Sequence, residues 1–149
     1  MSATPKSSAT PSARVHVHSI KQRSTETVRA IEEWALPDEL ASCGKARQLV
    51  TTALLNWQVP GDDAVLVVSE LVGNALVHGE GPVVLRLAHD GPLVRIEVRD
   101  TSSVLPYRHS VRENEVAGRG LLIVGELAAD WGVVIGPGRC KTVWAELPV

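Results

Sequence analysis

The chain has 149 residues, 44% of them hydrophobic, and a formal net charge of −2. This is the composition of a globular chain long enough to bury one core, and the lack of a basic block argues against nucleic acid as the main partner. No apolar run reaches the roughly 18 residues of a membrane span, and the placing of Cys43 and Cys140 fits neither a zinc site nor a disulfide framework, which favours a reduced, cytoplasmic setting.

The first part of the chain is polar. Residues 1–13 are rich in Ser, Ala, Thr and Pro and lack the apolar core of a secretory signal, so we expect a disordered tail and then a single domain over residues 14–149. The alternating stretch RVHVHSI, at 14–20, is typical of a strand. His16 and His18 would share one face of that strand, as metal ligands do, but without a third ligand nearby solvated histidines are the better interpretation.

A strand and a helix are expected next. Residues 32–36 predict a short strand. The apolar residues that follow have mostly helical spacing, which predicts a helix from Asp38, as its cap, to about Trp57. The sequence VPGDD then breaks the chain.

A second helix is predicted to be capped by Asp62 or Asp63 and to end at His78, with Gly79 just past its end. Gly73 lies inside this helix, where glycine lowers helix propensity by about 1 kcal/mol relative to alanine. Close approach of another group is one reason for a glycine at this position.

The C-terminal half predicts two hairpins and a helix. The runs PVVLRLA and LVRIEVRD flank HDGP, where Asp-Gly readily adopts positive φ angles, and a second hairpin turns at Pro137-Gly138. Between them lie a polar stretch, residues 101–117, and a helix opened by glycines in GRGLLIVGELAADW. This order predicts an α+β fold, a two-layer sandwich of a mixed, mostly antiparallel sheet with helices on one face.

Polar residues form a stripe on the second predicted helix. A helix advances about 100° per residue, so Glu70, Asn74 and His78 lie within about 80° of one another, opposite a broad apolar arc. Apolar residues, among them Val67, border the stripe, as on the floor of a ligand cleft. The alternative is an ordinary amphipathic helix with a solvated face, because this spacing of three polar residues is a weak signal by itself.

Three further features favour the cleft. Asp100 ends an apolar strand, where a carboxylate can accept a hydrogen bond from an exocyclic amine or simply cap a turn. Gly118 and Gly120 fall at a helix start, where backbone amides attract an anion such as a phosphate, or where the glycines merely cap the helix. Thr142, on the last predicted strand, can bond a base or hold a water, or serve only as a β-branched strand former.

In this order, the motifs VVSELVGNALVH, IEVRD, GRGLLIV and KTVWAEL resemble the GHKL (histidine-kinase-like) ATPase superfamily. The likeness is greatest to stand-alone bacterial ATP-binding proteins related to anti-sigma-factor serine kinases, and it covers about residues 32–147. It implies a Bergerat-type ATP-binding fold, with ATP and Mg²⁺ as cofactors and residues 101–117 as a lid-like loop.

The resemblance also implies roles for individual residues. Asn74 would hold the Mg²⁺ that bridges the ATP phosphates, and Glu70 would be the general base. Asp100 would accept a hydrogen bond from the adenine amine, and Thr142 would be a further contact to the nucleotide. The other nucleotide-binding residues that it implies, near the phosphates or the lid, are His78, Gly118, Arg119, Gly120 and Leu121.

One departure from the family pattern bears on binding. Related kinases carry Asp-x-Gly-x-Gly at the motif that begins with Asp100, whereas this chain has Ser102 and Val104 at the glycine positions. The backbone there loses its freedom to adopt positive φ angles, and side chains crowd the base. We therefore expect weaker adenine binding than in those kinases.

The likeness leaves more than one function open. The first is a serine/threonine protein kinase that sequesters a sigma factor and phosphorylates its antagonist, which the retained Glu70 and Asn74 favour. The second is a partner-switching module with weak or no use of ATP, which the altered Asp100 motif favours. A bare fold used for dimerisation would leave the polar stripe unexplained. The implied partners are a sigma factor, an anti-sigma-factor antagonist or both, and a second copy of the chain paired through residues 14–36.

Overall fold

The computed structural model of the chain describes residues 14–15, 30–101, 115–138 and 140–149. The elements of this described part, in chain order, are β1 (Arg14–Val15), β2 (Ala30–Leu36), α1 (Ala41–Asn56), α2 (Asp62–His78), β3 (Val83–Asp90), β4 (Leu93–Asp100), α3 (Glu115–Leu127), β5 (Asp130–Ile135) and β6 (Lys141–Pro148). The expected tail, both histidines of the first predicted strand and most of the expected lid lie outside the described residues.

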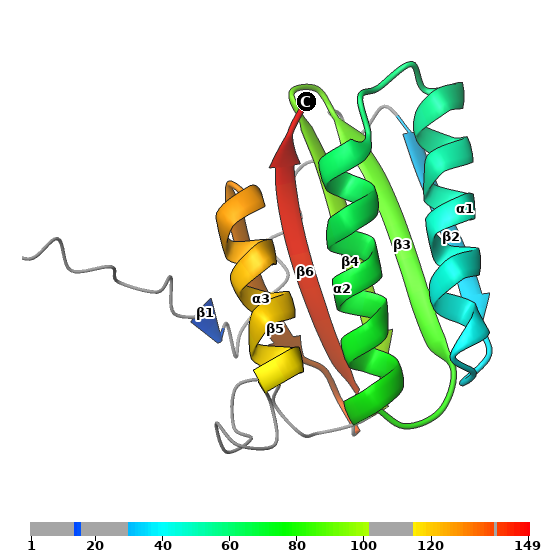
Figure 1. Ribbon diagram of the computed structural model, residues 1–149, viewed down its shortest axis with the longest axis vertical. Helices are drawn as coiled ribbons and strands as arrows, with labels where there is room; N and C mark the ends of the chain where they lie inside the picture. Colours follow the sequence, from blue (N-terminus) through cyan, green and yellow to red (C-terminus); the bar gives the residue numbers. More distant parts are fainter. Residues whose placement is uncertain (1–13, 16–29, 102–114, 139) are drawn as a thin grey trace, which may run out of the picture.

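The strands and helices form two layers. The sheet has the strand order β1-β5-β6-β4-β3-β2, and all neighbours pair antiparallel except β1, which pairs parallel with β5. The helices α1, α2 and α3 cover one face of this sheet, with α2 in the middle (Figure 1). This confirms the predicted α+β sandwich with a mixed, mostly antiparallel sheet. Both hairpins, β3–β4 and β5–β6, also form where the sequence predicts them.

The strands alternate between an apolar face under the helices and a charged face away from them. On β4, Val94, Ile96 and Val98 are buried, whereas Arg95 and Glu97 between them are half-buried. Alternation with a period of two is what a sheet covered on one side requires. It fixes the register of each strand, because a slip by one residue would exchange the two faces.

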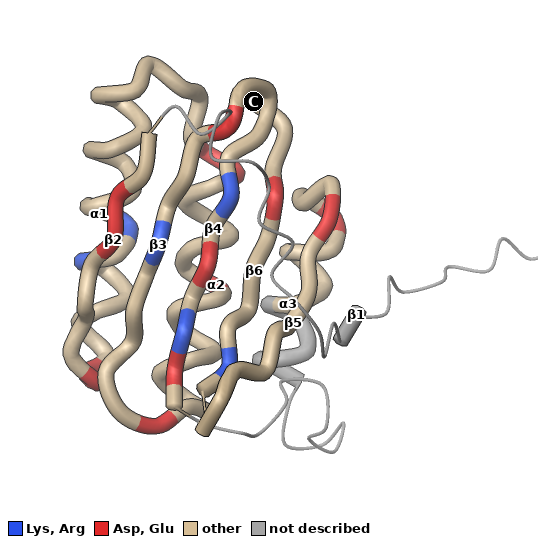
Figure 2. Tube along the Cα trace, turned by 180° about the vertical axis from the view of Figure 1, so that it is seen from behind, with Lys and Arg blue, Asp and Glu red and all other residues tan. Residues whose placement is uncertain are grey.

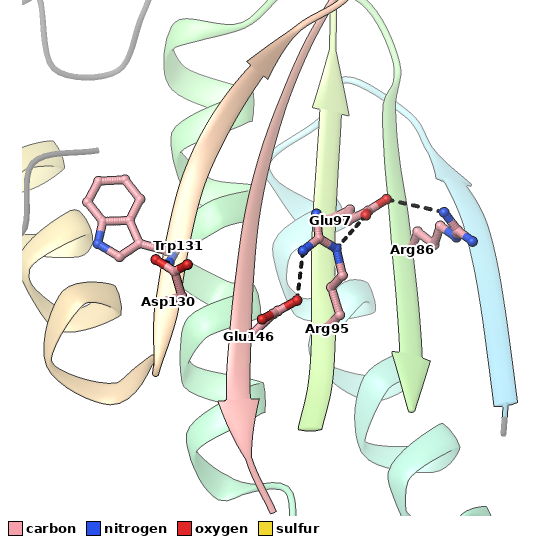
Figure 3. A network of polar contacts seen from close by, with 6 residues as sticks. All are labelled: Arg86, Arg95, Glu97, Asp130, Trp131 and Glu146. Carbon is pink, nitrogen blue, oxygen red and sulfur yellow. Dashed lines mark hydrogen bonds and ion pairs between the residues drawn. The ribbon is translucent and has the colours of Figure 1, made fainter. Parts of the chain in front are cut away.

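Ion pairs occupy the face of the sheet opposite the helices, which is the face toward the viewer in Figures 2 and 3. Arg95 lies over the ring of Trp144, 4.4 Å from its centroid. The same guanidinium group pairs with Glu97 at 2.7 Å and with Glu146 at 3.0 Å, and Arg86 joins through Glu97 at 3.5 Å. Because most of these groups are partly exposed, each pair contributes about 1 kcal/mol or less to stability.

The first full strand and helix start earlier or later than the sequence predicts. The strand expected at 32–36 is β2, which begins at Ala30. Asp38 does not cap α1, because the backbone at 37–40 forms a turn of its own before the helix begins. Leu40 takes the cap position, and no side chain bonds to the free amides there.

Helix α2 has the predicted bounds, but its ends are built differently. Asp62 and Asp63 are not caps; they lie in the first turn, where their negative charges complement the helix dipole. Gly61 holds the cap position, because a β-carbon there would lie 2.7 Å from a leucine side chain of α1. At the other end, Gly79 follows the helix as predicted, with a φ of −89° and an extended backbone rather than a left-handed turn.

The centre of the core is the side of α2 that faces the sheet and its neighbouring helices. Its buried residues are Ala64, Val67, Val68, Leu71, Val72 and Ala75. Val67 is fully buried although it borders the predicted polar stripe. The Cys43 thiol of α1 donates to the Ser69 carbonyl oxygen of α2 at 3.5 Å, and α3 also packs against α2. The local pattern could not show this contact, since α3 comes from a distant part of the sequence.

Two glycines of this region give opposite predictions. A β-carbon at Gly73 meets no described atom within 4 Å, so the close approach expected there is not found in the described part of the chain. Gly73→Ala should therefore raise the free energy of unfolding, measured by urea denaturation, by about 0.5–1 kcal/mol. Gly79→Ala is the control. Its β-carbon would overlap the Ala75 carbonyl oxygen, so this substitution should lower the free energy of unfolding by about 1–3 kcal/mol. A loss of stability in Gly73→Ala would contradict an open helix face.

Candidate functional site

A small cavity lies between α2 and the neighbouring ends of β4 and β6. Its lining residues are Leu71, Asn74, Ala75, His78, Val98, Asp100, Lys141 and Val143. Three of the predicted site residues, Asn74, His78 and Asp100, therefore meet at one place, although Asp100 is distant from the other two in sequence. Polar groups that converge in a mostly apolar setting are typical of a ligand site.

The geometry of one helix and one strand explains this meeting. Asn74 and His78 lie one turn apart in the C-terminal half of α2. Asp100 is the last residue of β4, and alternation from Val98 turns its side chain toward the helices. Glu70, one turn before Asn74, is half-buried and is not among the described residues that line the cavity.

Gly79 lets the helix end approach the strand end closely. A β-carbon on Gly79 would lie 2.9 Å from the Oδ2 atom of Asp100, closer than side chains pack. The turn after the helix is also bonded to the strand end, because the Thr101 amide donates to the Glu80 carbonyl oxygen at 3.2 Å and the Thr101 hydroxyl donates to the same oxygen. Backbone contacts therefore fix the position of Asp100.

Asp100 is paired with Lys141, a residue that the sequence analysis did not single out. The Nζ atom of Lys141 lies 3.5 Å from Oδ2 of Asp100, and the two side chains are only 3% and 2% exposed. Burial of either charge alone would cost several kcal/mol, and their mutual attraction offsets part of that cost. The pair is thus a buried feature of the site rather than a surface contact.

On the last strand, Lys141 rather than Thr142 faces the cavity. In the register of β6 with β4, Lys141 lies opposite Asp100, whereas Thr142 lies opposite Arg99 on the other face of the sheet. Thr142 is on the last strand as predicted, but this position does not bring it to the cavity. The sequence did contain a signal for the orientation of Lys141. Val143 is apolar and buried, and side chains two residues apart lie on the same face of a strand, so Lys141 faces the helices as Val143 does.

Helix α3 starts earlier than predicted. It begins at Glu115, so Gly118, Arg119 and Gly120 lie within its first two turns and not at its start. The free amides of the helix end therefore precede the glycines, and the last three residues of the expected lid are helical. Leu121 is half-buried and packs against the core.

The space inside the cavity is small. About 10 Å³ is open beside Lys141, roughly the room for one water molecule. The carboxylate of Asp100 and the amide of Asn74 are the kinds of groups that bind an amine and a magnesium ion, so the polar groups suit a nucleotide in kind. An adenine ring does not fit beside Lys141 as the side chain now lies.

The described part of the chain has a further hollow, which lies apart from this cavity. This larger hollow of about 290 Å³ lies between β2 and α1, with Glu32, Trp34 and Lys45 among its lining, away from every predicted site residue. Within the described ranges, no group of three His, Cys, Asp or Glu side chains is placed to hold a metal ion. None of the described helices is long and apolar enough to span a bilayer.

Comparison with known proteins gives a family and a fold. Residues 36–146, which include every predicted site residue, match the family model described as the histidine kinase-like ATPase domain. Among solved structures, the chain is similar to one in the SiaB–SiaC complex from Pseudomonas aeruginosa, with a TM-score of 0.55 and 11% sequence identity. This similarity covers 81% of the present chain and 90% of that chain, and at such low identity it shows the fold alone. No curated protein matches the sequence.

The buried ion pair predicts energetic coupling between its members. Asp100→Asn and Lys141→Met should each lower the free energy of unfolding by about 3–5 kcal/mol, because each removes one charge of a buried ion pair. The double variant should lose less than the sum of the two, by about 1–3 kcal/mol. Urea denaturation of the four proteins completes the cycle, and strictly additive losses would show that the two groups do not interact.

Proposed function

The chain belongs to the histidine kinase-like ATPase family, and from this premise we propose that it is an ATP-binding regulatory protein that acts on a partner protein. The observation that carries the proposal is the convergence of Asn74, His78 and Asp100 on one cavity. An amide, an imidazole and a carboxylate that converge at the edge of an apolar core are groups of the kind that orient a bound ligand by hydrogen bonds.

ATP and Mg²⁺ are the proposed cofactors. Asp100 would accept a hydrogen bond from the adenine amine, and the amide oxygen of Asn74, a hard ligand, would hold Mg²⁺ together with phosphate oxygens and water. His78, at the C-terminal end of α2, would lie toward the phosphates. When bound, ATP supplies a phosphoryl group for transfer.

The finer proposal is a serine/threonine protein kinase. Glu70 is half-buried one helical turn from Asn74, where its carboxylate is placed to take the proton of a partner hydroxyl. The hydroxyl would belong to a serine or threonine of an anti-sigma-factor antagonist, and the protein would otherwise hold a sigma factor.

A protein partner and a homodimer belong to the same proposal. The similar solved structure is a complex of SiaB with SiaC, which supports a protein partner for the present chain. Pairing of two copies through residues 14–36 is supported by the position of β2 at one edge of the described sheet. Edge strands carry backbone groups that can pair with another chain.

A second candidate is a partner-binding module with weak or no use of ATP. Lys141 favours it, because its ammonium group already pairs with Asp100 and little open space remains beside it. The two candidates share a partner protein, and they differ in whether phosphate is transferred to it.

Two substitutions on α2 should separate nucleotide binding from phosphate transfer. Asn74→Ala should weaken Mg-ATP binding about tenfold or more, because it removes the proposed ligand of the metal. Glu70→Ala should retain nucleotide affinity but lower phosphate transfer by about 10²–10⁴-fold. Glu126→Ala, the same change at an exposed acid on α3, is the control and should alter neither.

Calorimetry with purified protein measures the affinities. A pull-down from native lysate, with and without Mg-ATP, supplies the partner for transfer of radiolabelled phosphate. A partner that binds but never receives label would overturn the kinase and leave the binding module. Failure of the wild type to bind ATP or ADP would overturn the proposed nucleotide binding and leave only the binding of a partner protein.

A further inference from the structure

Lys141 is exceptional among the side chains of β6 that face the helices. The others on that face are Val143, Ala145 and Leu147, which are all buried and apolar. Lys141 is buried to a similar degree, with 3% of its side chain exposed. Because removal of an ammonium group from water costs several kcal/mol, packing alone does not account for a lysine here.

The chemistry of Asp100 accounts for it. An ionised carboxylate only accepts hydrogen bonds, and an ammonium group donates them as an exocyclic amine does. With its Nζ atom 3.5 Å from Oδ2, Lys141 offers Asp100 the same kind of partner that a purine amine would offer. The lysine side chain also lines the cavity together with Asn74 and His78, and about 10 Å³ is open there.

We propose that Lys141 is a built-in competitor of the nucleotide base: its ion pair with Asp100 and the binding of an adenine ring at Asp100 exclude each other. This inference rests on the proposed function and names the residue that sets the nucleotide affinity of the same site. Lys141 acts by occupying the site and not by contact with the nucleotide. Tight binding of a nucleotide requires Lys141 to leave Asp100.

The position of Lys141 in the fold permits this departure. It is the first residue of β6 and pairs with Ile135, the last residue of β5. The turn just before it contains Gly138, with a φ of 75°, and is closed by a hydrogen bond of 2.9 Å from the Gly136 amide to the Cys140 carbonyl oxygen. A long lysine side chain at a strand end can swing its charge into water while the backbone ladder stays intact.

Titration of lysine variants with Mg-ADP tests the proposal. Lys141→Ala removes both the ammonium group and most of a side chain that lines the cavity, so this variant should bind Mg-ADP about tenfold or more tightly than the wild type does. Addition of Asp100→Asn to Lys141→Ala should cancel this gain. Lys45→Ala is the matched control, because Lys45 is exposed on α1, and its affinity should equal that of the wild type.

Two further measurements protect the test against a variant that does not fold. Lys141→Thr keeps a β-branched residue that suits a strand and a hydroxyl that can donate to Asp100, and it should change the affinity in the same direction. In the wild type, reductive methylation read by mass spectrometry should label Lys141 faster when Mg-ADP is added. The labelling of Lys45 should stay constant.

The possible failures are distinguishable. If the wild type binds Mg-ADP and both Lys141 variants bind it equally or more weakly, the competitor role is overturned and the proposed function stands. If Lys141 labelling does not respond to a nucleotide that binds, the competitor role is overturned as well. If neither the wild type nor any folded variant binds nucleotide, both proposals fall, because removal of Lys141 has then opened no site.

Discussion

The buried contact between Asp100 and Lys141 is the constraint on which the rest of the site depends. Two opposite charges lie together at the end of an apolar sheet face, where their mutual attraction offsets part of the cost of burying each of them. The antiparallel register of β4 and β6 places them opposite each other. Gly79 admits the carboxylate beneath the end of α2, and the bonds from Thr101 to the turn after the helix hold the strand end in place. The strand end that carries the carboxylate is thus held by the bonds of Thr101, whereas the partner of the carboxylate, Lys141, has a long and flexible side chain.

A sheet covered on one side explains why the site lies where it does. The faces of β4 and β6 under the helices are apolar along most of their length. Charged residues, Asp100 and Lys141, stand on these faces only at the strand ends. The polar residues Asn74 and His78 of α2 reach this same edge. The charges of the opposite face, around Arg95, are partly exposed and already paired with one another. These charges keep one face of the sheet polar and the other apolar. At the buried edge, by contrast, a ligand would form hydrogen bonds in place of those that the polar residues make now.

Local patterns predicted much of this structure. The bounds of α2 and both hairpins follow from helical spacing and turn chemistry, whereas the meeting of Asn74, His78 and Asp100 at one site was implied by the family resemblance. The burial of Val67 did not, because local spacing does not show which elements pack around α2, among them α3 from a distant part of the chain. The start of α3 at Glu115 was hidden by the glycines after it. Lys141 and Thr142 are neighbours on β6, so their side chains point to opposite faces of the sheet. The sequence motif alone does not show which of them faces the helices, whereas the register of β6 with β4 does.

A crystal structure of the protein with bound Mg-ADP would test most directly the central claim, that a nucleotide base and Lys141 compete for Asp100. The account predicts the adenine amine within hydrogen-bonding distance of the Asp100 carboxylate, the phosphates on the side of Asn74, and the ammonium group of Lys141 displaced from its present partner. An intact pair of Asp100 and Lys141 beside a bound adenine would contradict the account. So would a nucleotide bound elsewhere, such as in the hollow between β2 and α1.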